Sequence, residues 1–293
     1  MPKVYTFMFW FSISLVVLAI IATAVFGLKL GVDFKGGSVM ELSGTAHVDP
    51  TQVSAVLTPK IGDVEVNSEG ETGVIVRAHE LTEAQHQLAL AALQTAFPKA
   101  GLQEKQFSSV GPVIGNELKS KSITAILIVL FAVIIYIAFV FRKIGRTTSS
   151  WAMGLSAIVA LLHDVLIPVG VFAVLGHYYG IEVTGVFVAA ALTILGFSVS
   201  DTVVIFDRVR ENIIRGGSKQ SFAEVVHKSV LQTLARSLNT VFTVLLSLFA
   251  IYFFGGTSIK YFSLALIIGI FLGAYSSIFV ASPLLVWWTK KRA

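Results

Sequence analysis

Long apolar runs dominate the pattern of hydrophobic and polar positions along the chain. A membrane-spanning helix needs about 20 apolar residues to cross a hydrocarbon core about 30 Å thick. Uncharged runs suited to this role occupy Tyr5–Leu28, Ser122–Phe141, Leu238–Phe254 and Tyr261–Thr289. Two further runs, Trp151–Leu175 and Val183–Phe206, contain one acidic residue each, Asp164 and Asp201. The pattern therefore predicts six transmembrane helices.

The first run shares some features with a cleaved signal peptide. Lys3 precedes it, and the small residues Ala22 and Ala24 lie within it. Its apolar stretch continues past that point, however, and exceeds the about 7–15 residues of a signal peptide's hydrophobic region. We therefore expect a retained helix at 1–28.

The segment between the first two predicted helices has the mixed polarity of a soluble domain. Its periodicities predict, in order, strand 38–43, helix 50–57, strand 63–67, strand 73–78, helix 82–97 and strand 105–110. The turn of the central hairpin is expected at Ser68-Glu69-Gly70. This β-α-β-β-α-β order is that of a ferredoxin-like sandwich. We expect an α-helical polytopic membrane protein with a first helix at 1–28, an external α+β domain at 29–121 and five further helices at 122–293.

The composition agrees with a membrane protein and excludes several other classes. Hydrophobic residues make up 55% of the 293 positions and charged residues 13%, and the mean hydropathy is +0.81. A soluble domain carries roughly a quarter charged residues, so a soluble enzyme and a disordered tail are excluded. The net charge of +5 does not indicate nucleic-acid binding, because no basic stripe runs along a soluble face.

Cysteine is absent from the sequence, which excludes disulfides, thiolate catalysis and cysteine-ligated metals. No HExxH motif or comparable set of metal ligands occurs either. We expect no catalytic residues, no metal and no cofactor.

The distribution of basic residues predicts the orientation in the membrane. An even number of spans places both termini on one side. That side carries thirteen basic residues: Lys3, Arg142, Lys143, Arg146, six between Arg208 and Arg236, and Lys290–Arg292. The other side has five close to the helix ends: Lys29, Lys35, Lys119, Lys121 and Lys260. Short loops rich in Lys and Arg stay in the cytoplasm, so both termini are predicted to be cytoplasmic and 29–121 external.

Two acids and a polar stripe lie within the predicted spans. An acid at the centre of a membrane helix costs roughly 2.5–3.5 kcal/mol and should face a partner or water. Asp164 follows His163 midway along the third span, and Asp201 lies in the fourth among Ser198, Ser200 and Thr202. Helical spacing places five polar residues entering the fifth span on one face: Arg236, Asn239, Thr240, Thr243 and Ser247. We expect this polar stripe to point into the bundle.

These polar residues allow several interpretations. They either only join helices by hydrogen bonds, or they form a proton path in which Asp201 titrates and Arg236 controls its protonation. An acid among hydroxyls suits H⁺ and Na⁺ equally. An intramembrane aspartyl protease would need Asp164 and Asp201 within a few ångströms of each other as a dyad, and the GxGD string is absent.

Seven strings resemble segments of SecD and SecF proteins. In order they are GVDFKGG at 31–37, SVGPVIGNEL at 109–118, ALLHDVLI at 160–167, GFSVSDTVVIFDRVREN at 196–212, LARSLNT at 234–240, FGG at 254–256 and YSSIFVASPL at 275–284. The ordered set covers essentially the whole chain, so the sequence is identified as a member of this family. A SecD-like chain would carry a much larger external domain, and the resemblance therefore points to the SecF side of the family.

The resemblance implies a role in protein export. Proteins of the SecF type pair with SecD in a membrane unit of the resistance-nodulation-division (RND) type in the bacterial cytoplasmic (inner) membrane. The pair associates with the SecYEG channel, often with YajC, while SecA pushes preproteins through the channel. The pair is thought to use the proton-motive force for late translocation and release. The alternative is a proton-driven RND-type small-molecule exporter, for which one domain at 29–121 leaves little room for a drug pocket.

The resemblance also implies roles for individual residues. Asp201 and Arg236 correspond to the family's proposed proton route, and Asp164, Ser198, Thr202, Asn239 and Thr240 are further candidates for it. The cytoplasmic mouth would be formed by Asp207, Arg208, Arg210 and Glu211. A turn that couples the first helix to the external domain would be formed by Gly31, Asp33, Phe34, Gly36 and Gly37. The alternative for these glycines is a simple exit from the first helix.

Overall fold

The chain forms two compact units in the computed structural model, which describes residues 1–142, 150–216 and 220–290. Unit 1 comprises Met1–Lys29 and Ile123–Ala293, and unit 2 comprises Leu30–Ser122. Five of the basic residues counted above lie outside the described residues: Lys143, Arg146, Lys219, Lys291 and Arg292.

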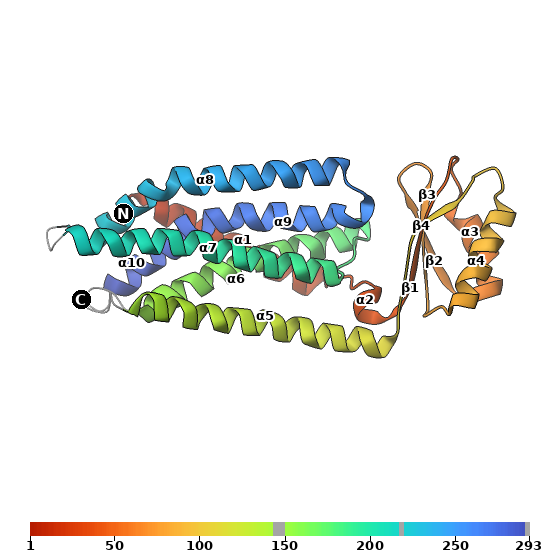
Figure 1. The fold of residues 1–293 in the computed structure, drawn as a ribbon, viewed down its shortest axis with the longest axis horizontal. Coiled ribbons are helices and arrows are strands. Elements are labelled where there is room, and N and C mark those ends of the chain that lie inside the picture. Colours follow the sequence, from red (N-terminus) through yellow and green to blue (C-terminus); the bar gives the residue numbers. More distant parts are fainter. Residues whose placement is uncertain (143–149, 217–219, 291–293) are drawn as a thin grey trace. The chain divides into compact units, whose positions relative to one another are not determined.

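Within the described residues, six helices are long and apolar enough to cross a membrane, which confirms the predicted number; all lie in unit 1 except the first residues of the second helix, which belong to unit 2. They are α1 (Lys3–Phe26), α5 (Pro112–Val140), α6 (Ser150–Tyr179), α7 (Gly185–Gly216), α8 (Phe222–Phe254), and α9 (Thr257–Ser276) continued by the π-helical turn η3 (Ser277–Ala281) and α10 (Ser282–Lys290). α1 begins and α10 ends at the same end of the bundle (Figure 1), as an even number of spans requires.

Two helices begin well before the apolar runs that predicted them. α5 begins at Pro112, a residue suited to the first turn of a helix. α8 begins after Ser221, which forms a reciprocal capping box with Glu224. The added turns carry charged residues, so an apolar window could not include them.

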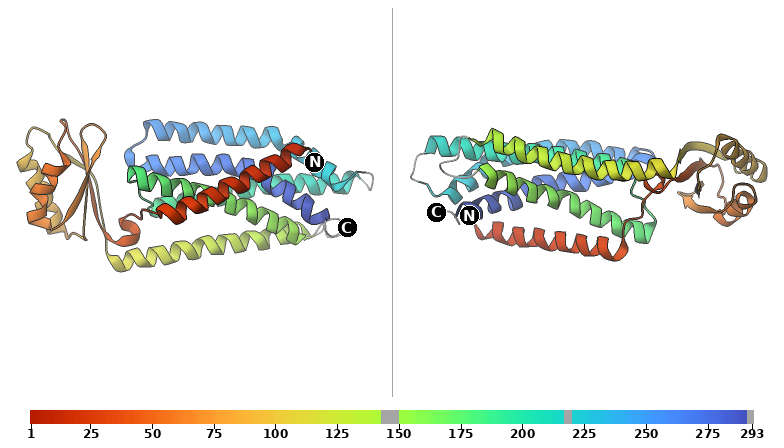
Figure 2. Two further views of the ribbon diagram at one scale, coloured as in Figure 1. Left: turned by 180° about the vertical axis from the view of Figure 1, so that it is seen from behind. Right: turned by 90° about the horizontal axis from the view of Figure 1, so that it is seen from below.

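Glycines allow the helices of unit 1 to approach closely. Figure 2 shows α1 crossing the bundle against α6, and a Cβ atom on Gly170 of α6 would lie 2.5 Å from the Cα atom of Ala19 in α1. On α9, a Cβ on Gly269 would meet the side chain of Ile194, and one on Gly273 the side chain of Ser198. These two glycines of α9 therefore let it pack closely against α7 inside the chain.

A hydrophobic cluster joins several helices of unit 1. It includes Phe141, Met153, Phe206 and Leu285, all fully buried. Phe141 directly follows α5, and its ring meets that of Phe206 edge to face at 6.2 Å. Much of α5 exposes large apolar side chains, among them Leu127 and Phe131, as a lipid-facing helix does.

Unit 2 is the predicted α+β domain. Its elements are the one-turn helix α2 (Val32–Lys35), β1 (Gly37–Ser43), α3 (Pro50–Ile61), β2 (Val64–Glu69), β3 (Gly73–Ala78), α4 (Glu83–Ala96) and β4 (Gln103–Val110). The four strands form an antiparallel sheet in the order β2-β3-β1-β4. This order and the βαββαβ sequence are ferredoxin-like, as predicted. The hairpin turn was placed slightly wrongly, because Ser68 and Glu69 continue β2 and the turn lies at 70–72.

Helices α3 and α4 bury their apolar faces against one face of this sheet. Leu57 of α3, Leu93 of α4 and Leu42 of β1 are fully buried in the shared core. The ring of His86 in α4 stacks on Phe107 of β4 at 3.7 Å, and its Nε2 lies 2.6 Å from Oε2 of Glu104. These contacts fix α4 to the edge strand.

We predict that Gly170→Ala destabilises unit 1 by about 1–3 kcal/mol, because the added methyl group meets backbone atoms that cannot rotate away. Thermal unfolding of the solubilised chain measures the effect. Gly196→Ala in α7 is the matched control, since its Cβ would meet nothing within 4 Å. Equal melting temperatures for the two variants would contradict the prediction.

Candidate functional site

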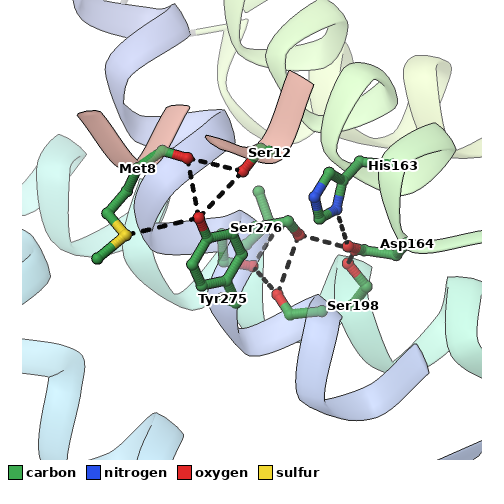
Figure 3. Close-up of polar contacts among 10 residues, drawn as sticks. Met8, Ser12, His163, Asp164, Ser198, Tyr275 and Ser276 are labelled. Atoms are coloured by element: carbon green, nitrogen blue, oxygen red, sulfur yellow. Dashed lines mark hydrogen bonds and ion pairs between the residues drawn. The ribbon is translucent and has the colours of Figure 1, made fainter. Parts of the chain in front are cut away.

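Asp164 lies at the junction of three helices and is completely buried. Its Oδ2 atom accepts hydrogen bonds from Oγ of Ser198 in α7 at 2.6 Å and from Oγ of Ser276 in α9 at 2.8 Å. Its Oδ1 atom lies 2.9 Å from Nδ1 of His163, the preceding residue in α6. The carboxylate therefore links α6, α7 and α9 (Figure 3).

The polar cluster around Asp164 extends toward α1 (Figure 3). The ring of His163 stacks on that of Tyr275 at 6.0 Å. The hydroxyl of Tyr275 donates to the backbone carbonyl of Met8 at 2.8 Å and accepts from Ser12 at 3.2 Å. His163, Ser12 and Ser276 are all buried, so the cluster is enclosed by helices of unit 1.

Asp201 is more open than Asp164 and has a different set of partners. It lies on α7 and is half-buried. Its Oδ1 atom accepts from Oγ of Ser237 in α8 at 2.5 Å, while its buried Oδ2 atom has no hydrogen-bond partner. The charges of Arg236 and Asp164 both act on it. An acid with one unpartnered oxygen and one oxygen bonded to a hydroxyl can take up and release a proton.

The polar stripe of α8 does not point into the bundle, so that expectation was wrong. All five of its residues are exposed in this chain: Arg236, Asn239, Thr240, Thr243 and Ser247. The hydroxyls of Thr240 and Thr243 donate to the carbonyls of Arg236 and Asn239, one turn earlier on the same helix. The buried face of α8 is a neighbouring one, which carries Ser237, Val241 and Leu248.

Two residues that contact the acids were missed from the sequence. Ser237 stands beside Arg236 but about 100° around the helix, on the buried face with Ser229 and Thr233. That spacing of four residues between hydroxyls was a signal for an inward polar face. Ser276 lies three residues after Gly273 at the end of α9, and no pattern in the sequence singled it out as a partner of Asp164.

Thr202 and Ser277 form a further buried contact, between α7 and the π-helical turn η3. Their hydroxyl oxygens are 2.8 Å apart. Ser282 donates to the carbonyl of Ser277 at 2.8 Å, across the five-residue step of this turn. π-helical turns inside α-helices occur frequently at functional sites, and this one directly follows Ser276.

The candidate residues of the cytoplasmic mouth pair with one another along the last turns of α7. Arg208 donates to Glu211 at 2.5 Å, and Arg210 lies 3.0 Å from Asp207. The neighbouring Asn212 donates from its amide to Ser229 and to Gln232 of α8, each at 2.8 Å. Asn212 was not singled out from the sequence, yet it joins α7 to α8.

The five candidate residues of the coupling turn belong to unit 2. α1 ends at Phe26 with Gly27 at φ +67°, so the exit from the first helix uses Gly27 and not the later glycines. Gly31 precedes α2, the helix that contains Asp33 and the buried Phe34. Gly36 and Gly37 follow at φ +79° and +120°, a region that L-residues with a Cβ atom rarely adopt.

The glycines of this turn pack directly on backbone. A Cβ on Gly36 would lie 2.7 Å from Cα of Pro112, and one on Gly37 would lie 2.8 Å from the carbonyl oxygen of Ala78. From the other side, a Cβ on Gly115 would lie 3.0 Å from the nitrogen of Gly36. The turn therefore fits closely against the first residues of α5.

The described residues contain no group of three or more His, Asp or Glu side chains arranged to hold a metal ion.

The amino-acid sequence matches two family descriptions. "Protein export membrane protein SecD/SecF, C-terminal" matches residues 90–291, and "SecD/SecF GG Motif" matches residues 21–44. The first covers the membrane helices from α5 onward, with both acids. The second covers the glycine turn at Gly36 and Gly37.

Relatives match over nearly the full length. The chain is 42% identical to "Protein translocase subunit SecF" of Thermobaculum terrenum over 291 residues, which are 96% of this chain and 90% of that protein. It is 33% identical to "Protein translocase subunit SecDF" of Thermus thermophilus, covering 95% of this chain and 37% of that protein. The crystal structure of SecDF from Thermus thermophilus matches with a TM-score of 0.82 at 31% identity, covering 98% of this chain and 38% of that one. The chain thus spans little more than a third of the SecDF proteins.

We predict that Gly36→Ala loosens the contact between α2 and the start of α5, because the methyl group meets the backbone of Pro112 and the φ angle is unfavourable. Hydrogen exchange of the full chain should rise at 32–37 and 112–116. Gly70→Ala is the control, since Gly70 has a similar φ of +63° but open space around it. Unchanged exchange in Gly36→Ala would show that the contact is not tight.

Proposed function

Because the chain belongs to the SecD/SecF family of protein export membrane proteins, we propose that it acts as the SecF partner of a SecD protein and couples ion flow to export. Membership of this family makes the chain a multi-pass membrane subunit of Sec protein translocation. The family is one of translocase subunits and not of enzymes. The proton-motive force as energy source, and late translocation and release as the step it drives, are parts of our proposal.

The environment of Asp201 carries the proposal. A carboxylate in a membrane helix is costly unless it has partners, and Asp201 leaves one buried oxygen without any. The unpartnered oxygen supports our proposal that Asp201 changes its protonation state. One proton crossing 100 mV releases about 2.3 kcal/mol, which is enough to shift the balance between two helix packings that differ by a few kcal/mol.

Arg236 is proposed to control this proton. Its charge acts on Asp201 from the start of the exposed polar stripe. Approach of the guanidinium favours the ionised acid and so promotes proton release. Asn239 and Thr240 would line the route along α8, and Ser198, Thr202 and Asp164 would line its inner side. Asp207, Arg208, Arg210 and Glu211 would form the mouth on the cytoplasmic side.

The exposed stripe also supports SecD as the partner. Polar side chains facing lipid are unfavourable, and such residues in membrane helices face protein or a water-filled cavity. Some relatives are single SecDF chains, of which this chain matches little more than a third. We propose that membrane helices of SecD cover the stripe. Association with SecYEG, SecA and YajC is proposed from the family resemblance.

The orientation completes the proposal. The chain would lie in the bacterial cytoplasmic membrane with both termini in the cytoplasm and unit 2 on the outer side. Unit 2 is continuous in sequence with α1 at its start and with α5 at its end. Changes in helix packing would reach it through the coupling turn at Gly31, Asp33, Phe34, Gly36 and Gly37.

We predict that Asp201→Asn abolishes the export function, because the amide keeps the shape of the side chain but cannot carry a proton. Preprotein export would be measured in bacteria depleted of their own SecF and supplied with this chain and its matched SecD. Wild type should restore export, and Asp201→Asn should leave it at the level of the depleted strain, at equal amounts in the membrane.

Asp63→Asn is the matched control, since it makes the same change at an exposed acid in unit 2. Equal restoration by Asp201→Asn and Asp63→Asn would overturn the role of Asp201 and leave the translocase assignment in place. Failure of the wild type itself would contradict export as the function.

We further predict that Thr243→Cys forms a crosslink with SecD, because Thr243 lies in the middle of the exposed polar stripe. The chain contains no cysteine of its own, so a single introduced thiol gives an unambiguous signal. Phe242→Cys is the control at the same depth, since Phe242 is 63% exposed on a neighbouring apolar face of α8. A stronger crosslink from position 242 would show that SecD covers a different face.

A further inference from the structure

Three consecutive residues, at the end of α9 and the start of η3, each contact a different helix of unit 1. The hydroxyl of Tyr275 donates to the carbonyl of Met8 in α1 at 2.8 Å (Figure 3). Ser276 donates to the buried carboxylate of α6 at 2.8 Å, and the hydroxyl oxygen of Ser277 lies 2.8 Å from that of Thr202 in α7. Successive residues of a helix point about 100° apart, so this short segment connects α1, α6 and α7.

The contact with α7 lies directly beside the acid proposed to carry the proton. Thr202 follows Asp201 on α7, and the side chains of Thr202 and Ser277 are both buried. Separating two buried hydroxyls is unfavourable, because no water replaces the lost partner of either one. A displacement of α7 at Asp201 therefore moves Ser277 and the end of α9 with it.

The contact with α1 is made by a tyrosine that is fixed at both its ring and its hydroxyl. The hydroxyl of Tyr275 donates to Met8 and accepts from the fully buried Ser12. The centroid of its ring lies 6.0 Å from that of His163 and 5.0 Å from that of Phe279, the usual spacing of packed rings. The side chain therefore moves as a rigid part of α9 and carries α1 with it.

The π-helical turn η3 separates the end of α9 mechanically from α10. Pro283 lies in the first turn of α10 and has no N–H group to donate back to η3. The regular ladder of helix hydrogen bonds is interrupted at this point, and helices bend preferentially at such interruptions. The end of α9 can therefore shift without carrying the whole of α10.

We propose that Tyr275 is a positioning residue for export, which transmits a shift of α7 to α1. The shift starts at Asp201 and reaches α9 through the contact between Thr202 and Ser277. Tyr275 then displaces α1 through the bond of its hydroxyl to Met8. Because α1 is continuous in sequence with unit 2, this polar bridge of Thr202, Ser277, Tyr275 and Met8 connects the acid to the external domain.

This inference rests on the proposed function, since a change of state at Asp201 starts the shift, but the bridge can be measured without export. The test places two spin labels in the full chain in lipid vesicles and measures the distance between them. The chain has no cysteine, so Leu18→Cys in α1 and Phe253→Cys in α8 carry the labels, at side chains that are 60% and 70% exposed. Asp201→Asn holds this position uncharged and should change the distance by about 1–2 Å, the usual size of a helix shift.

Tyr275→Phe should abolish this response, because the ring stays in place and only the hydroxyl that reaches α1 is lost. Tyr5→Phe is the matched control. It removes the same group from a buried tyrosine of α1, whose hydroxyl oxygen lies 3.0 Å from Nδ1 of His227 in α8, and the response to Asp201→Asn should persist in it. A purely structural role of Tyr275 would alter the distance in Tyr275→Phe but leave the response to Asp201→Asn unchanged.

Thr202→Val tests the other end of the bridge and serves as the second measurement if Tyr275→Phe does not fold. It should weaken the response, because the methyl group that replaces the hydroxyl cannot bond to Ser277. An undiminished response in either variant would overturn the proposal, and so would a response that is lost equally in Tyr5→Phe. A distance that Asp201→Asn leaves unchanged in the otherwise wild-type chain would also overturn it, even if that substitution abolishes export. A response that depends on Tyr275, together with normal export by Asp201→Asn, would support the bridge and contradict only the proposed function.

Discussion

The hydrocarbon interior of a membrane offers no hydrogen-bond partners, and the arrangement of polar groups in unit 1 follows from this constraint. Both carboxylate oxygens of Asp164 have hydrogen-bond partners inside the protein, which come from α6, α7 and α9. The helices can bring these donors together because small residues of α9 let it pack closely on α7. The hydrogen bonds to Asp164 therefore depend on the close packing of α9 against α7.

The two intramembrane acids differ in burial and in how many of their carboxylate oxygens have hydrogen-bond partners. Asp164 is enclosed and has all its donors within the chain, whereas Asp201 is half-buried and keeps one oxygen without a partner. Each has its own set of donors, which argues against a catalytic dyad that shares one proton. The difference in environment separates a group that organises helices from one suited to exchange a proton with its surroundings.

The exposed polar stripe of α8 also needs polar surroundings, and the part of this chain that the structure describes does not provide them. Within α8 the hydroxyls of Thr240 and Thr243 are satisfied by carbonyls of their own helix, yet the face as a whole remains exposed. A polar face of this kind in a membrane helix lies against protein or a water-filled cavity. The exposed stripe and the half-open Asp201 both support our proposal that a partner subunit completes the proton route.

Hydrophobic periodicity by itself determined the six spans, the βαββαβ order of unit 2 and the placement of both acids within spans. Each of these features depends only on residues that are close together in the sequence. It could not determine which face of α8 turns inward. The polar face with Arg236 and the face with Ser237 both carry hydroxyls at helical spacing, and only packing against α7 and α9 selects between them. The partners of His163 and Asp164 were likewise decided by tertiary structure, because Ser198 and Ser276 lie 34 and 112 residues away from Asp164. Contacts between residues so far apart in sequence depend on how whole helices pack, and no local pattern contains that information.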